Sequence, residues 1–167
     1  MLRLAILLAL LLPASASAKF VFFQTPSHNI GCVYSSSPAY LRCDIRSGLK
    51  PAPPKPKGCM NDWKFGYAVD ARGRARTVCA GDTVFSPTAK VIRYGRTWQG
   101  GAFTCKSSTS GLRCKNRSGH GFVLSRQHSY RFYLEVRRRF CNSSQRTRGC
   151  SPFRSPCPPV TMSSARW

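Results

Sequence analysis

Residues 98–125 carry the clearest structural pattern in the chain, and they read Trp98-Gln-Gly-Gly-Ala-Phe-Thr-Cys-Lys-Ser-Ser-Thr-Ser-Gly-Leu-Arg-Cys-Lys-Asn-Arg-Ser-Gly-His-Gly-Phe-Val-Leu-Ser125. An apolar lead-in precedes Cys105, a Ser/Thr/Gly turn follows it, and Cys114 stands before a second apolar run at 122–124. A strand, a turn and a strand, with one cysteine on each side of the turn, predict a β-hairpin closed by a Cys105–Cys114 disulfide.

The same arrangement occurs earlier, at residues 30–45, where Cys32 and Cys43 flank a Ser/Pro turn. Both copies close with the tripeptide Leu-Arg-Cys. We interpret them as a weak internal repeat, two hairpins that one small β-domain pairs face to face or edge to edge. A Cys32–Cys43 bridge across so short a loop stabilises the fold by about 3 kcal/mol in the chain-entropy model.

Residues 1–18 have the pattern of a secretory signal peptide, with Arg3, an apolar run at 4–12, and small residues up to Ala18. We expect cleavage before Lys19. The alternative is an uncleaved anchor helix, but this run is shorter than the roughly 20 residues that span a bilayer. No later run is long enough to span, and no cysteine at the cleavage site indicates a lipoprotein. The expected location is secreted or otherwise extracytoplasmic, in the cell envelope.

All nine cysteines follow this leader. In a small secreted chain that density predicts disulfides, because the compartment is oxidising and the hydrophobic core is thin. Structural zinc sites need pairs of cysteines with two to four residues between them, and the sequence has no such pair. We therefore predict no metal and no cofactor.

The remaining patterns are also β-type. Lys19–Gln24 is β-branched and aromatic, which predicts a strand buried on both faces. A third hairpin is expected from 63–70 and 74–79 around the turn at 70–73. The proline-rich segment 47–58 is typical of a stiff surface connector, with a proline-rich ligand as the alternative. The fold class is all-β, with at most a helical turn near 59–63 or after Ser125.

Several motifs resemble a family of small secreted, cysteine-rich bacterial proteins catalogued only as a domain of unknown function. The match covers about residues 20–131, and it is carried by Pro26-Ser-His-Asn-Ile-Gly-Cys32, Leu41-Arg-Cys-Asp44, Cys79-Ala-Gly-Asp-Thr83, Tyr94-Gly-Arg-Thr-Trp98, Phe103-Thr-Cys105, Gly111-Leu-Arg-Cys114-Lys-Asn116 and Gly119-His-Gly-Phe-Val-Leu-Ser-Arg126. The resemblance implies a compact extracytoplasmic β-domain with three disulfides. Order along the chain and the resemblance together make Cys59–Cys79 the third pair. No activity, substrate or cofactor is implied.

These observations define a disulfide-stapled single domain of β-hairpins, sandwich- or barrel-like, at 19–131. Residues 132–167 form an Arg/Pro/Ser-rich tail that departs from the family pattern, and we expect it to be mostly irregular. Three cysteines fall in this tail, Cys141, Cys150 and Cys157. A reading-frame change in the gene would also produce such a tail.

Charge gives the functional hypothesis. Residues 19–131 contain 19 lysines and arginines against four aspartates, and a balance this basic favours polyanions. The expected partners are anionic cell-wall polymers or membrane head groups. No motif indicates specific recognition of nucleic acid. A solvated outward face is the alternative for these charges. The candidate binding residues are Arg72, Arg74, Arg76, Lys106, Arg113, Lys115 and Arg117, the first three being expected on one side of a strand.

Two other function classes remain. A hydrolase would use His120 as a base with Ser125 or Asp82, although Ser125 lacks a nucleophile-elbow context. A secreted inhibitor or effector would present a stapled loop to another protein. We favour a non-enzymatic binding module with a basic surface for anionic envelope polymers.

Overall fold

The computed structural model describes residues 17–134, which contain eleven short strands and no helix. Among these residues no helix is long and apolar enough to cross a membrane. The strands are β1 Phe20–Gln24, β2 Ile30–Ser36, β3 Ala39–Ile45, β4 Gly66–Asp70, β5 Arg76–Thr77, β6 Lys90–Val91, β7 Thr97–Gly100, β8 Phe103–Ser108, β9 Gly111–Asn116, β10 Gly121–Leu124 and β11 Tyr130–Phe132.

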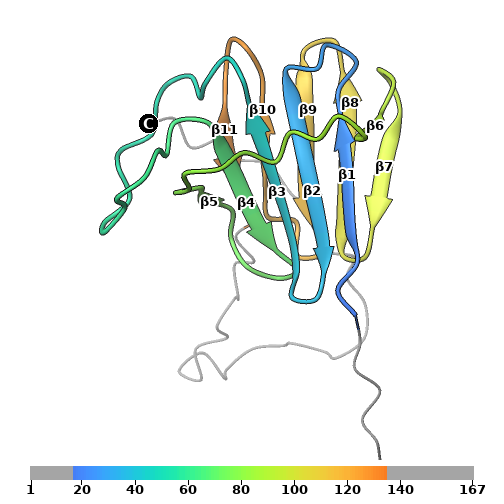
Figure 1. Cartoon of the computed structure of the whole chain (residues 1–167), viewed down its shortest axis with the longest axis horizontal. Helices are drawn as coiled ribbons and strands as arrows, with labels where there is room; N and C mark the ends of the chain where they lie inside the picture. The colour runs from blue at the N-terminus through green and yellow to red at the C-terminus, as the bar shows by residue number, and fades with distance from the viewer. Residues whose placement is uncertain (1–16, 135–167) are drawn as a thin grey trace, which may run out of the picture. The chain divides into compact units, whose positions relative to one another are not determined.

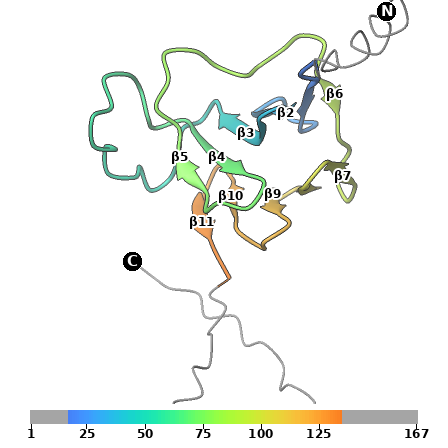
Figure 2. The same cartoon turned by 90° about the horizontal axis from the view of Figure 1, so that it is seen from below.

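The strands form two sheets that pack face to face as a sandwich (Figures 1 and 2). One sheet has six strands in the order β5-β4-β3-β2-β1-β6, and the other has five in the order β11-β10-β9-β8-β7. All neighbours are antiparallel except β1 and β6. Apolar side chains from both inner faces make one core. The all-β fold class predicted from the sequence is confirmed.

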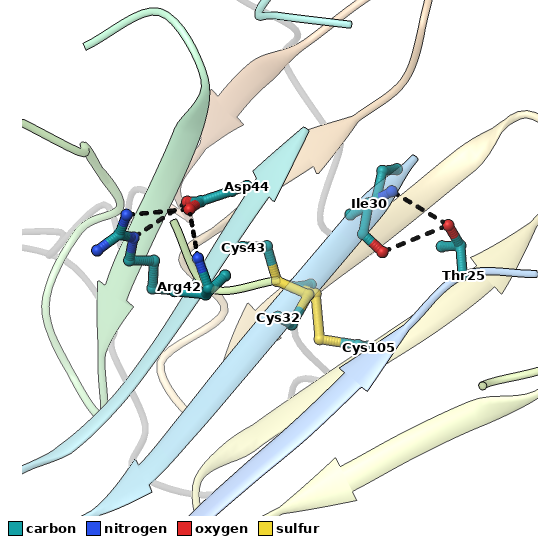
Figure 3. Close-up of a disulfide and its surroundings, with 9 residues drawn as sticks. Thr25, Ile30, Cys32, Arg42, Cys43, Asp44 and Cys105 are labelled. Atoms are coloured by element: carbon teal, nitrogen blue, oxygen red, sulfur yellow. Dashed lines mark hydrogen bonds and ion pairs between the residues drawn. A yellow bond between two sulfur atoms is a disulfide. The ribbon is translucent and has the colours of Figure 1, made fainter. Parts of the chain in front are cut away.

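The two repeated hairpins lie in different sheets, so they pair face to face and not edge to edge. Cys32 is directly opposite Cys43 in the register of β2 and β3, and Cys105 is directly opposite Cys114 in that of β8 and β9. Each pair is joined by a disulfide, and all four cysteines are fully buried in the same core cluster (Figure 3). The third disulfide joins Cys59 to Cys79. These are the pairs that the sequence suggested.

Strand β1 corrects one expectation, since it is not buried on both faces. Phe23 is 1% exposed in the core, whereas Phe20 is 55% and Phe22 is 37% exposed on the opposite face. The reason is position: β1 lies next to the two-residue edge strand β6, which pairs only with Phe23 and Gln24. An apolar run alone does not reveal how much neighbouring chain covers its outer face.

The third hairpin is present but shorter than expected, with β5 reduced to two residues. The proline-rich segment 47–58 is irregular, and no helical turn occurs at 59–63 or after Ser125. Strand β11 runs through Phe132, one residue beyond the expected end of the domain at Arg131. Residues 1–16, which include most of the predicted signal peptide, and residues 135–167, with the three tail cysteines, lie outside the described residues.

A segment that we call the strap, residues 78–89, joins β5 to β6 and crosses the outer face of the six-stranded sheet (Figure 1). Its passage is tight at Phe85, because a Cβ atom on Gly31 would lie 2.6 Å from the Phe85 ring. The guanidinium of Arg46 lies 3.9 Å from the centre of that ring. The strap therefore closes over the sheet rather than passing above it through solvent.

A buried ion pair anchors the strap to β3. Arg42 donates two hydrogen bonds to the Asp44 carboxylate, at 3.0 and 2.9 Å (Figure 3). It donates another to the Asp82 carboxylate in the strap at 3.0 Å. The backbone N–H of Val84 donates to Asp44 at 3.0 Å. Burial raises the pKa of Asp44, whereas the hydrogen bond from Arg42 lowers the pKa of the exposed Asp82. The fully buried Asp44 carboxylate thus has its charge matched by Arg42, whose side chain is only 13% exposed.

Replacing Asp44 by alanine is expected to lower the free energy of unfolding by about 3–5 kcal/mol, because it leaves Arg42 with only the exposed Asp82 as an ionic partner and leaves the N–H of Val84 without its acceptor. Urea unfolding of the two proteins measures the difference. The matched control is Asp70→Ala, which breaks an ion pair with Arg76 that is 54% exposed on both sides. That change is expected to cost only about 0–1 kcal/mol. Equal losses for the two variants would contradict the anchoring role of Asp44.

Candidate functional site

Acidic and basic residues are segregated along the folded domain. The four aspartates of the described region all fall between residues 44 and 82, within or beside the six-stranded sheet. From Thr83 to Leu134 the chain has no aspartate or glutamate and nine lysines and arginines. This second segment supplies the whole five-stranded sheet, so that sheet carries positive charge alone.

Three of those cations lie together on the outer face of the five-stranded sheet. Lys106 in β8 and Arg113 in β9 are direct cross-strand partners, and Lys115 follows two residues after Arg113 on the same face. All three are exposed. Like charges placed directly opposite one another destabilise a sheet. Stability of the fold therefore does not account for this pairing, and we take these three residues, the basic face, as the candidate site.

Aromatic packing holds the central arginine of the basic face in position. The guanidinium of Arg113 lies 3.8 Å from the centre of the Phe132 ring in β11. That ring lies over Gly121 of β10, where a Cβ atom would be 2.8 Å from it and would overlap the Cys114 carbonyl oxygen. Glycine at 121 is thus required for Phe132 to support Arg113. Phe132 is not among the site residues predicted from the sequence, because its placement follows from the β10–β11 register and not from any local motif.

The internal repeat shows how the two outer faces differ. In both hairpins the Leu and Cys of Leu-Arg-Cys point into the core and the arginine points outward. In the first hairpin the next residue is Asp44, which neutralises Arg42 beneath the strap. At the corresponding place in the second hairpin the chain has Lys115. The same scaffold therefore carries a closed ion pair on one sheet and two exposed cations on the other.

The other predicted binding residues are dispersed. Arg72, Arg74 and Arg76 do not share a strand, because only Arg76 belongs to β5. Arg76 donates to Asp70 at 2.7 Å, and the guanidinium of Arg74 lies 4.3 Å from the centre of the Tyr133 ring. Arg72 is in the β4–β5 turn. The regular alternation of arginines reflects a turn followed by a short strand.

Arg72 and Arg117 instead lie at the same end of the sandwich. The two line a pocket of about 330 Å³. Asn116, only 3% exposed, joins their turns: its amide donates to the carbonyl oxygens of Asp70 and Gly73, both at 2.8 Å. Its carbonyl accepts from the backbone N–H of His120 at 3.0 Å. One buried side chain thus ties the β4–β5 turn of one sheet to the β9–β10 turn of the other.

The structure does not bring the three catalytic candidates together. His120 and Ser125 flank opposite ends of β10, whose four residues span about 13 Å. The Ser125 hydroxyl donates to Gln127 at 3.1 Å and accepts from two backbone N–H groups of its own turn. Asp82 is paired with Arg42 on the other sheet. This serine caps a turn and this aspartate anchors the strap, so the hydrolase constellation is not formed.

Within residues 17–134 no group of three His, Cys, Asp or Glu side chains is arranged to hold a metal ion. The connection between β3 and β4 projects from the side of the sandwich (Figures 1 and 2), and the Cys59–Cys79 disulfide joins it to the strap. Met60 in this connection is 90% exposed. A partner-binding role for this loop stays a prediction.

The architecture and the charge distribution together describe a disulfide-closed β-sandwich with one basic sheet face. The chain belongs to the Family of unknown function (DUF6636), whose model matches residues 2–132. The family resemblance expected from the sequence is confirmed. No curated protein and no solved structure matches the chain.

Replacing Asn116 by alanine is expected to cost about 1–3 kcal/mol of folding stability, because the change leaves buried backbone groups of two turns unpaired. It should also lower the NMR order parameters of the Arg72 and Arg117 amides, since these turns lose their shared anchor. The control is Asn29→Ala, which removes a buried amide at a distant site, one that donates to Ser47 at 3.2 Å. Unchanged order at 72 and 117 in Asn116→Ala would contradict the proposed anchor.

Proposed function

We propose that this protein is a non-enzymatic binding module that holds an anionic polymer of the cell envelope against the outer face of its five-stranded sheet. The observation that carries the proposal is the basic face, where Lys106, Arg113 and Lys115 lie side by side on a sheet without one acidic residue. An unneutralised cluster of cations on a rigid sheet is the arrangement that binds a chain of repeated negative charges.

The spacing of the cations suits such a chain. Along β9, Arg113 and Lys115 are two residues apart, or about 7 Å, and Lys106 lies about 5 Å across the ladder from Arg113. A linear polyanion laid over the sheet would meet several positive charges at once. Binding would release the counterions that these charges otherwise attract, and that release is the main source of affinity in such complexes.

The neighbours of the basic face are uncharged and able to contribute hydrogen bonds or stacking. Thr97 and Thr104 flank the cations on β7 and β8, and Tyr130 lies on the same rung of the sheet as Arg113 with 45% of its surface exposed. Hydroxyl groups and aromatic rings beside cations are suited to a polymer that carries both phosphate groups and polyol or sugar units.

The compartment supports an envelope polymer as the partner. Three disulfides are typical of an extracellular or otherwise oxidising environment. Together with the signal-peptide pattern of residues 1–18, they support secretion. Teichoic-type polymers and anionic lipid head groups are the polyanions available there, and a continuous phosphodiester chain fits the extended face better than single head groups do.

The mature protein is expected to bind a teichoic-type polymer at low salt and to lose affinity steeply as salt increases. The variant Lys106→Gln/Arg113→Gln/Lys115→Gln should bind weakly at every salt concentration. Its plot of log affinity against log salt should be shallower by roughly one for each phosphate group that the protein no longer neutralises. Isothermal titration at several salt concentrations measures both quantities.

A matched control removes the same charge from other parts of the domain, with Lys50→Gln/Lys57→Gln/Lys90→Gln. These lysines are exposed in loops and in the edge strand of the six-stranded sheet. This control should bind nearly as tightly as the parent protein, provided that circular dichroism shows both variants folded. Equal losses of affinity in the two triple variants would mean that net charge, and not the basic face, determines binding.

A further inference from the structure

The pocket between Arg72 and Arg117 has a position and composition unlike those of the basic face. It opens at one end of the sandwich, among four turns, two from each sheet. Loops at the end of a rigid β-scaffold are common places for ligand sites. The pocket of about 330 Å³ is lined by Ala39, Ala71, Arg72, Gly101, Ala102 and Arg117.

The floor of this pocket is apolar and continuous with the core. The three alanines are partly buried and pack against the core cluster of the sandwich. Gly101 lies at φ 55°, a backbone conformation that favours glycine. A Cβ atom there would also lie 2.5 Å from the Tyr34 hydroxyl. A small ligand group in the pocket would therefore meet methyl groups and backbone beneath it.

The rim is cationic. Among residues 17–134 neither Arg72 nor Arg117 has an ion-pair partner, and the nearest acid along the chain to Arg72, Asp70, is engaged by Arg76 at 2.7 Å. The buried amide of Asn116 fixes the two turns that carry these arginines. Arginine presents a planar fork of donors that matches the oxygens of phosphate or carboxylate. Two such groups line this pocket, on turns that one buried side chain ties together.

We infer that this pocket is a binding site for a phosphate or carboxylate group carried on a short apolar stem, with Arg72 and Arg117 clamping the anion and the alanine floor contacting the stem. Because Lys115 lies directly before Asn116 and Arg117, the pocket adjoins one end of the basic face. The anionic group has two possible sources, the end of a polymer chain and a free small molecule. The first source rests on the proposed function, and the second does not.

The test uses n-butyl phosphate and inorganic phosphate as probes, titrated into the mature protein and followed by NMR shifts of the Arg72, Arg117 and Ala102 amides. Butyl phosphate should bind at least several-fold more tightly than inorganic phosphate, since only it reaches the apolar floor. Arg72→Gln/Arg117→Gln should weaken butyl phosphate binding about tenfold or more, because charge-assisted hydrogen bonds are removed. Equal affinity for the two probes, or no effect of the double variant, would overturn the inference.

Two variants separate this pocket from the basic face. Ala71→Leu fills the floor, so it should abolish the preference for butyl phosphate while inorganic phosphate still binds; a preserved preference would contradict the apolar floor. The triple variant of Lys106, Arg113 and Lys115 should keep butyl phosphate binding. If the parent protein binds butyl phosphate but no polymer, the proposed function is wrong and the pocket assignment stands. If it binds the polymer but not butyl phosphate, the pocket assignment is wrong and the proposed function stands.

A last comparison distinguishes the two sources of the anion. A short teichoic-type polymer is bound before and after enzymatic removal of its terminal phosphate. If the pocket takes chain ends, removal should weaken binding to the parent protein but not to Arg72→Gln/Arg117→Gln. If removal changes neither, the natural ligand is a free small molecule, and the site assigned by the butyl phosphate titration stands.

Discussion

The buried pairing of Arg42 with Asp44 is the constraint on which the two-sided character of the domain depends. It holds the strap through Asp82 and Val84, so that the strap covers the outer face of β2 and β3 over a neutralised pair of charges. A buried ion pair contributes little net stability compared with an apolar packing, but breaking it is costly. Its effect here is to fix where one particular loop lies. Without that loop the outer face of β2, which includes the bare backbone of Gly31, would be open to water.

The internal repeat places two similar hairpins in the domain, one in each sheet, with different outer faces. Two hairpins with directly opposed, disulfide-bonded cysteines supply both halves of the core, and each projects an arginine outward. The outer faces of the two hairpins differ in the residue that follows Leu-Arg-Cys. In the first hairpin this residue is Asp44, which binds the strap that covers the face, and in the second it is Lys115, which keeps the face positively charged. Arg113 rests on an aromatic ring in place of a carboxylate, so its charge stays available to a ligand. The two hairpins thus have the same backbone frame, and a few outward side chains account for the chemical difference between their outer faces.

Local patterns in the sequence were sufficient for the hairpins and for two of the disulfides, because the cysteines flank short turns and face each other across a ladder. They were not sufficient for features that depend on long-range pairing. The exposed face of β1 follows from its short pairing with β6, and the separation of Arg72 from Arg76 follows from a turn of residues 71–73. Asp82 had the appearance of a polar site residue because no motif indicates that Arg42, 40 positions away, engages it. Of the predicted binding residues, the three on β8 and β9 could be placed together from the hairpin alone, whereas the Arg72–Arg117 pocket required the packing of both sheets.

An anionic polymer is proposed to bind along the outer face of the five-stranded sheet and not along the outer face of the six-stranded sheet. The most direct measurement is an NMR footprint of the isotopically labelled mature protein with a teichoic-type polymer at low salt. The account predicts that the largest shifts, and the strongest protection of amides from solvent exchange, fall on β8 and β9 around Lys106, Arg113 and Lys115, with β10 and β11 next. Shifts centred on the strap and β3, or spread evenly over every exposed lysine and arginine, would contradict it.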